Sequence, residues 1–320
     1  MAFSKKSIFY LFAVLVFVFG AYFFFSGDRS IENAERVAGL RVAATINPLY
    51  DILKNIAGDG ARVVRILPPG ASPHTYDPSP GDIVRLQETK IIFAIGFGLD
   101  DRATGIGAAV PGSKIATVER GIELIEREED EEARFEEEEG EDEHGHEGLI
   151  DPHYWLSFVN AENIAENIRD TLIEADPEGA AGYEQNTADY IAGLRQARSR
   201  LKGGLTGLTE RKIITLHDGW YYFARDFGLE IVGTLEPSAG REPTPRYLAE
   251  LGRAARESGV SVIFAEPQLH SQALETFAKE NNLSIAVLDP LGGTPGREGF
   301  IELMEYNAAE VLRALGGADY

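Results

Sequence analysis

Short apolar runs alternate with helix-like segments along this chain, and the alternation occurs twice. Runs of four to six mostly apolar residues are typical of parallel strands, because such strands are buried on both faces of their sheet. Strands that alternate with helical segments predict an α/β fold with a parallel sheet. The predicted strands cover residues 40–45, 63–67, 91–95 and 114–118 in the first set, and 212–216, 230–234, 260–265 and 284–288 in the second.

A long stretch without strand-like runs separates the two sets, and its pattern predicts helices at 161–174 and 182–201. We therefore expect two parallel-sheet (β/α) lobes, at residues 39–175 and 209–320, joined by a long rigid connecting helix within residues 176–208. In open parallel sheets ligands bind beyond the carboxyl ends of the strands. A ligand site is therefore expected in the cleft between the lobes.

The most acidic part of the chain interrupts the first lobe. Between residues 126 and 147, fourteen Asp and Glu residues stand against two Arg, and His144 and His146 lie near the end of this run. A segment with this charge and no apolar periodicity is typical of a mobile, solvated loop. We expect a mobile acidic loop over 126–148, in which the two histidines would provide auxiliary metal capture.

The bulk composition excludes several classes of function. The net charge of −22 argues against nucleic-acid partners, because binding to the phosphate backbone requires a basic face. The chain has no cysteine, which excludes disulfides, thiolate metal ligands, a catalytic thiol and lipid attachment to a cysteine. Any metal site must therefore use histidine, carboxylates and water, a donor set that suits an oxidising compartment outside the cytoplasm.

The N-terminus resembles a targeting segment. Lys5 and Lys6 precede an apolar run of eighteen residues, 8–25, which just reaches bilayer-spanning length. We expect residues 1–26 to be an uncleaved membrane anchor, with a cleaved secretory signal as the alternative, and residues 27–38 to be a tether. Either reading places the remaining chain outside the cytoplasm, in the periplasm or at the cell surface.

Single histidines and carboxylates lie near the ends of several predicted strands. His74 follows the second strand, His217 directly follows the strand at 212–216, and Glu266 and Asp289 follow the last two strands. His153 joins this set if the segment after the acidic loop returns to the cleft. Three neutral imidazoles and one carboxylate are a suitable ligand set for a tetrahedral divalent ion.

Each of these residues also has a structural interpretation. A lone histidine at a strand end is more often a hydrogen-bonded structural residue than a ligand, and Asp289 before a proline could simply belong to a turn. Glu266 is predicted to hydrogen-bond a ligating histidine and fix its tautomer rather than to bind the ion. His270 is predicted to be an ordinary surface or helix-start residue.

Five motifs together resemble the metal-binding receptors of bacterial ABC uptake systems for zinc and manganese, the zinc-uptake/adhesin solute-binding family. The similarity extends from about residue 42 to residue 315. An acidic, histidine-bearing loop before the second histidine is also a feature of that family. The motifs are LPPGASPHTYDP at 67–78, DPHYWLS at 151–157, LHDG at 216–219, FAEPQ at 264–268 and LDPLG at 288–292.

The resemblance implies two α/β lobes joined by a rigid helix, with one metal ion bound between them. It implies the metal ligands His74, His153, His217 and Asp289, and delivery of the ion to an ABC permease that is powered by a cytoplasmic ATPase. Family members with histidine at the third position favour zinc and those with a carboxylate favour manganese, so His217 predicts Zn²⁺ as the transported ligand, with Mn²⁺ as the alternative.

We therefore expect a monomeric, extracytoplasmic metal receptor that is not an enzyme. Its affinity for zinc should fall as the pH drops through the imidazole range, because protons compete for the ligand lone pairs. The alternatives are a manganese receptor, an adhesin that uses its metal structurally, and a zinc hydrolase with a metal-activated water. The absence of a nucleophile–base pair in the sequence, and closure of the site by Asp289, argue against the hydrolase.

Overall fold

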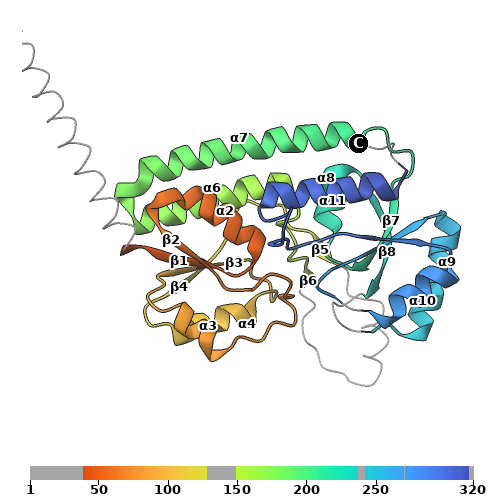
Figure 1. The fold of residues 1–320 in the computed structure, drawn as a ribbon, viewed down its shortest axis with the longest axis horizontal. Coiled ribbons are helices and arrows are strands. Elements are labelled where there is room, and N and C mark those ends of the chain that lie inside the picture. The colour runs from red at the N-terminus through yellow and green to blue at the C-terminus, as the bar shows by residue number, and fades with distance from the viewer. Residues whose placement is uncertain (1–38, 128–148, 237–241, 270, 317–320) are drawn as a thin grey trace, which may run out of the picture.

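Two four-stranded parallel sheets form the framework of the protein, and each is covered by helices (Figure 1). The computed structural model describes residues 39–127, 149–236, 242–269 and 271–316. The predicted anchor, the tether and most of the acidic loop, including His144 and His146, lie outside these ranges, as does His270.

The sheet of the first lobe has the strand order β2-β1-β3-β4. The apolar side chains of the two central strands, β1 and β3, are buried on both faces, as expected for parallel strands enclosed by helices. Helix α2 (Asn47–Ala57) covers one face, while α3 (Pro80–Arg85) and α4 (Asp101–Gly105) cover the other. The strands are β1 (Arg41–Ala44), β2 (Arg62–Arg65), β3 (Ile91–Ala94) and β4 (Lys114–Thr117).

The sheet of the second lobe has the order β10-β9-β7-β8. Its inner face packs on α8 (Tyr221–Phe227) and α11 (Phe300–Ala314), and its outer face packs on α9 (Pro245–Ser258) and α10 (Gln272–Glu280). The strands are β7 (Lys212–His217), β8 (Glu230–Glu236), β9 (Val262–Ala265) and β10 (Ser284–Val287).

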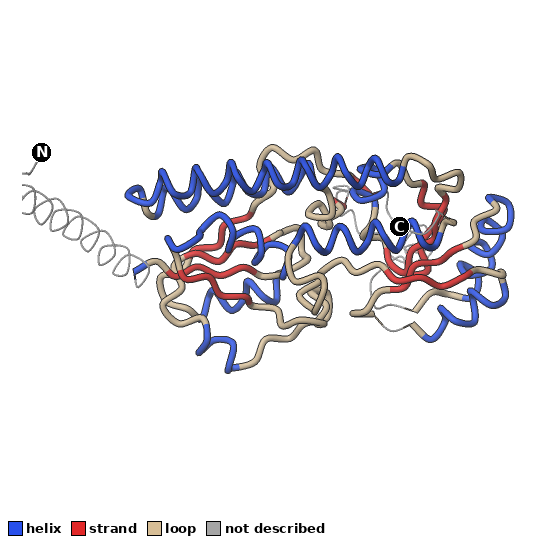
Figure 2. Tube along the Cα trace, turned by 45° about the horizontal axis from the view of Figure 1, so that its top comes forward, coloured by secondary structure: helices blue, strands red, loops and turns tan. Residues whose placement is uncertain are grey.

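Two helices connect the lobes. Helix α6 (Phe158–Ala175) begins at Ser157, whose hydroxyl accepts a hydrogen bond from a backbone N–H of the first turn, an arrangement that satisfies one of the unpaired donors at a helix start. Helix α7 (Ala180–Leu205) has 26 residues and is about 39 Å long. It packs against α2, α6 and α11, and so lies along both lobes (Figure 2).

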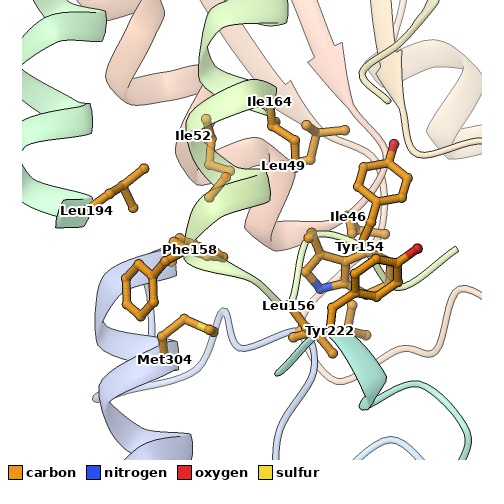
Figure 3. Close-up of a cluster of buried hydrophobic side chains, with 14 of the residues drawn as sticks. Ile46, Leu49, Ile52, Tyr154, Leu156, Phe158, Ile164, Leu194, Tyr222 and Met304 are labelled. Atoms are coloured by element: carbon orange, nitrogen blue, oxygen red, sulfur yellow. The ribbon is translucent and has the colours of Figure 1, made fainter. Parts of the chain in front are cut away.

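The two lobes share one hydrophobic core instead of meeting at a polar hinge. Figure 3 shows part of it, with Ile46 and Leu49 from the first lobe, Phe158 from α6 and Met304 from α11. Polar contacts add to this packing, because the Asn47 amide donates to backbone carbonyls of the segment 291–298. The lobes are therefore fixed relative to each other beneath the cleft.

This arrangement confirms the predicted α/β fold with two parallel-sheet lobes and a long connecting helix. One detail differs from the sequence prediction: Glu126 and Arg127 form strand β5 (Glu126–Arg127), which pairs antiparallel with β6 (Leu149–Ile150). The first two residues of the predicted loop therefore belong to a strand, and residues 128–148 lie outside the described ranges. Antiparallel backbone pairing requires no apolar pattern in so short a strand, so the sequence carried no sign of it.

Within the four described ranges, no helix is both long and apolar enough to cross a membrane. The predicted anchor at residues 1–26 is not among them.

Candidate metal centre

Three histidines from separate parts of the chain converge between the lobes. His74 lies in the loop after β2, His153 in the segment between β6 and α6, and His217 is the last residue of β7. One nitrogen from each of the three rings lies within 4.8 Å of the corresponding nitrogens of the other two. His153 and His217 are each 2% exposed, and His74 is half-buried. The structure therefore brings together the three histidines singled out in the sequence.

The separations of the ring nitrogens fit a single tetrahedral ion. The Nε2 atom of His153 lies 3.2 Å from Nε2 of His74 and 3.2 Å from Nε2 of His217. Nitrogens that share a tetrahedral ion at zinc–nitrogen bond lengths of about 2.0–2.1 Å are about 3.3 Å apart. The side chains therefore already approach the ligand spacing that a zinc ion would require.

Local backbone structure fixes these positions. His217 lies at the carboxyl end of β7, where parallel sheets bind ligands. Gly219 lies against both buried imidazoles: a Cβ atom there would be 2.5 Å from Nε2 of His217 and 2.9 Å from a ring carbon of His153. Glycine at this position therefore allows the backbone to pass next to the two rings.

Carboxylates behind two of the histidines orient the rings. Oδ1 of Asp151 accepts hydrogen bonds from Nδ1 of His153, at 2.8 Å, and from its backbone N–H, at 2.9 Å. Oε1 of Glu266 accepts from Nδ1 of His217 and, at 2.9 Å, from Nε1 of Trp220. A proton on Nδ1 leaves the Nε2 lone pair free for an ion, as in metal sites with carboxylate-supported histidines.

Burial lowers the pKa of His153, and the hydrogen bond to Asp151 opposes this shift without reversing it. The ring is therefore neutral at pH 7 and able to bind a cation. Glu266 occupies the supporting position that the sequence suggested. Sequence reasoning did not assign such a role to Asp151, although its place two residues before His153 was a usable signal.

Removal of either supporting charge is expected to weaken zinc binding without removing a ligand. We expect Asp151→Asn and Glu266→Gln each to lower zinc affinity by about 10–100-fold, the usual cost of losing such a partner. Competitive titration with a chromogenic chelator measures this. Glu162→Gln is the matched control, because Glu162 pairs with Arg195 on the surface. Unchanged affinity in both site variants would show that these carboxylates do not orient the ligands.

The carboxylate of Asp289 is buried, and two of its neighbours, Gln268 and Pro290, line the cavity of the histidines. Among the described residues, Asp289 does not belong to the group of converging ligand atoms. Its Oδ2 lies 3.0 Å from Nε of Arg297, and its Oδ1 accepts from the Gln268 amide at 2.7 Å. The structure therefore gives Asp289 other partners than an ion. Its assignment as fourth ligand stays a prediction.

The space around the histidines is small. The cavity has a volume of ≈ 10 Å³, about enough for one water molecule or ion. Trp155, Leu269 and Leu291 are among the apolar side chains that enclose it. An organic substrate would not fit beside the histidines in this conformation.

Comparisons with known proteins agree with this geometry. Residues 42–314 match the family described as "Zinc-uptake complex component A periplasmic", ZnuA. The zinc-binding protein AdcA of Streptococcus pyogenes is 27% identical over 81% of this chain. The manganese-binding lipoprotein MntA of Halalkalibacterium halodurans is 26% identical over 90% of this chain and 93% of its own. This chain spans about half the length of the AdcA relatives, 52% for the S. pyogenes protein.

Solved structures give the same result. A crystal structure of ZnuA, 29% identical, superposes with a TM-score of 0.74 over 87% of this chain and 100% of its own. The binding protein FpvC of Pseudomonas aeruginosa, solved with Mn²⁺, is 27% identical, with a TM-score of 0.73 over 88% of this chain and 100% of its own. Zinc-binding and manganese-binding proteins therefore share this fold.

Proposed function

This chain belongs to the ZnuA family of periplasmic zinc-uptake components, and we propose that it is an extracytoplasmic receptor that captures Zn²⁺ and delivers it to an ABC permease. The proposed ligands are the Nε2 atoms of His74, His153 and His217. The observation that carries the proposal is their convergence in a buried cavity of ion size. The permease would be driven by an ATPase on the cytoplasmic side, and residues 1–26 would tether the receptor to the membrane.

The receptor is proposed to act as a monomer without catalytic activity. A zinc hydrolase needs room for its substrate next to the metal-bound water, and the cavity of ≈ 10 Å³ offers none. Imidazole donors suit zinc, whereas manganese prefers oxygen donors, so three histidines favour zinc over the manganese carried by some relatives.

The acidic loop, with His144 and His146, is proposed to attract cations by its charge, an effect that salt should screen.

Competition between the two metals tests the proposed specificity. Chelator-stripped protein offered equal concentrations of Zn²⁺ and Mn²⁺ should retain one zinc per chain and little manganese, because the nitrogen-rich site binds zinc more strongly. Metal analysis after removal of unbound ions gives the ratio. A chain that retained mainly manganese would keep the receptor class and overturn the zinc assignment.

A further inference from the structure

Protein groups contact both oxygens of the Asp289 carboxylate. Oδ1 accepts from the Gln268 side-chain amide at 2.7 Å and from the backbone N–H groups of Leu291 and Gly292, at 3.0 Å each. Oδ2 forms a 3.0 Å ion pair with Nε of Arg297. The side chain of Asp289 is 1% exposed and that of Arg297 is 21% exposed. Both carboxylate oxygens therefore already have partners in a largely dry environment.

The surrounding contacts fix both members of this ion pair. The Asn307 side chain accepts from the backbone N–H of Asp289 and donates to its carbonyl, each at 2.8 Å. The guanidinium of Arg297 lies over the ring of Tyr306, 4.3 Å from its centroid, and also donates to Thr294 at 2.9 Å. Movement of Asp289 toward an ion would therefore break several contacts at once.

The first lobe also anchors this loop. The Trp155 indole donates to the carbonyl of Pro290 at 2.9 Å, and the Asn47 amide donates to the carbonyl of Leu291 at 3.1 Å. Trp155 follows His153 by two residues, so the contact that holds the loop is adjacent to a proposed ligand. The position of the Asp289–Arg297 pair is thus set from both lobes.

If Asp289 left this position, a mostly buried guanidinium would lose its counter-charge. Removing one partner of a buried ion pair is strongly unfavourable, because the other charge is left uncompensated in a low-dielectric environment. In exchange for the broken ion pair, the bound ion would gain an oxygen ligand beside the three imidazoles. Oxygen ligands favour manganese more than zinc. The ion pair therefore bears directly on which metal the site prefers.

We propose that Arg297 is a specificity-determining residue that withholds the Asp289 carboxylate from the ion and so biases the three-histidine site toward zinc. A water would then take the fourth position. The Gln268 side chain supports this, because it lines the cavity and its buried Oε1 has no hydrogen-bond partner among the described residues, which leaves an acceptor for a water hydrogen. This inference rests on the proposed function as a metal receptor.

Two substitutions and their combination test the inference. Arg297→Met removes the charge but keeps an apolar stem, and should raise Mn²⁺ affinity by at least about tenfold, since Asp289 becomes free to bind a hard cation. Asp289→Asn alone should leave Zn²⁺ affinity within about threefold, because Asp289 does not touch the ion. The double variant should lose the manganese gain. Arg200→Met, which breaks a surface ion pair with Glu305, is the matched control.

Two results would overturn the proposal. One is a loss of zinc affinity of about 100-fold or more in a folded Asp289→Asn variant, more than a supporting group usually costs. The other is a folded Arg297→Met variant without any gain for Mn²⁺. If the variants do not fold, infrared difference spectra of the unaltered chain with ¹³C-labelled aspartate decide. No band of a metal-bound aspartate carboxylate should appear on addition of one equivalent of zinc, and the appearance of such a band would contradict the proposal.

These outcomes are separable from failure of the proposed function. A chain that is not a metal receptor would bind no stoichiometric zinc before any substitution is made. A receptor in which Asp289 binds the ion would take up zinc normally and fail only in the Asp289 and Arg297 comparisons.

Discussion

Replacement of His217 by alanine is expected to lower zinc affinity by more than about 100-fold, equivalent to about 2.7 kcal/mol. Loss of a carboxylate that supports a ligand usually lowers metal affinity 10–100-fold. His217→Ala removes the ligand itself and also the imidazole that hydrogen-bonds Glu266. The other two described imidazoles, His74 and His153, are themselves proposed ligands, so neither can substitute for His217. Competitive titration with a chelator of known affinity measures the loss.

His270→Ala is the control for this experiment, because the sequence predicts a surface position for His270. Thermal unfolding of the metal-free proteins would show whether the His217 variant is still folded. A folded His217→Ala variant with unchanged zinc affinity would mean that zinc binds elsewhere, for example in the acidic loop, and the three-histidine centre would have to be abandoned.

Zinc is expected to stabilise the protein strongly without being required for folding. A ligand that binds only the native state at 1,000 times its dissociation constant adds about 4.1 kcal/mol. The melting temperature shifts by about 2–4 °C per kcal/mol in domains of 150–250 residues and by less in larger ones, so it should rise by up to roughly 8–16 °C here. The metal-free chain should stay folded, since one hydrophobic core joins both lobes without involving the histidines. Calorimetry with and without zinc measures both effects.

The same experiment separates a receptor from a protein with a structural metal. A receptor must remain folded after its ion is released. Cooperative unfolding of the chain by a chelator at room temperature would instead favour the adhesin alternative, in which the metal holds the fold together.

The fold could be predicted because both of its sheets are parallel. The strands β3 (Ile91–Ala94) and β9 (Val262–Ala265) are almost wholly apolar, which marks strands buried on both faces. The same regularity located the candidate site. His217 directly follows an apolar run, and the carboxyl ends of parallel strands gather at one edge of a sheet.

The ring orientations and the partners of Asp289 could not be predicted in this way. The hydrogen bond from Nδ1 of His217 to Glu266 joins residues on β7 and just after β9, and the pairing of Asp289 with Arg297 depends on how the loop after β10 turns back. Both contacts arise from tertiary packing, and no local pattern encodes them. Asp289 lies after the predicted strand, as expected, but the sequence pattern did not indicate that Arg297 would form an ion pair with it.

The central claim is that three converging imidazoles bind one zinc ion. X-ray absorption at the zinc edge of the full chain, loaded with one equivalent of zinc after stripping, tests it most directly. We predict one zinc per chain with a four-coordinate shell at about 2.0–2.1 Å and the outer-shell scattering of three imidazoles. Substoichiometric zinc, or a shell of oxygen donors with fewer than two imidazoles, would contradict the claim.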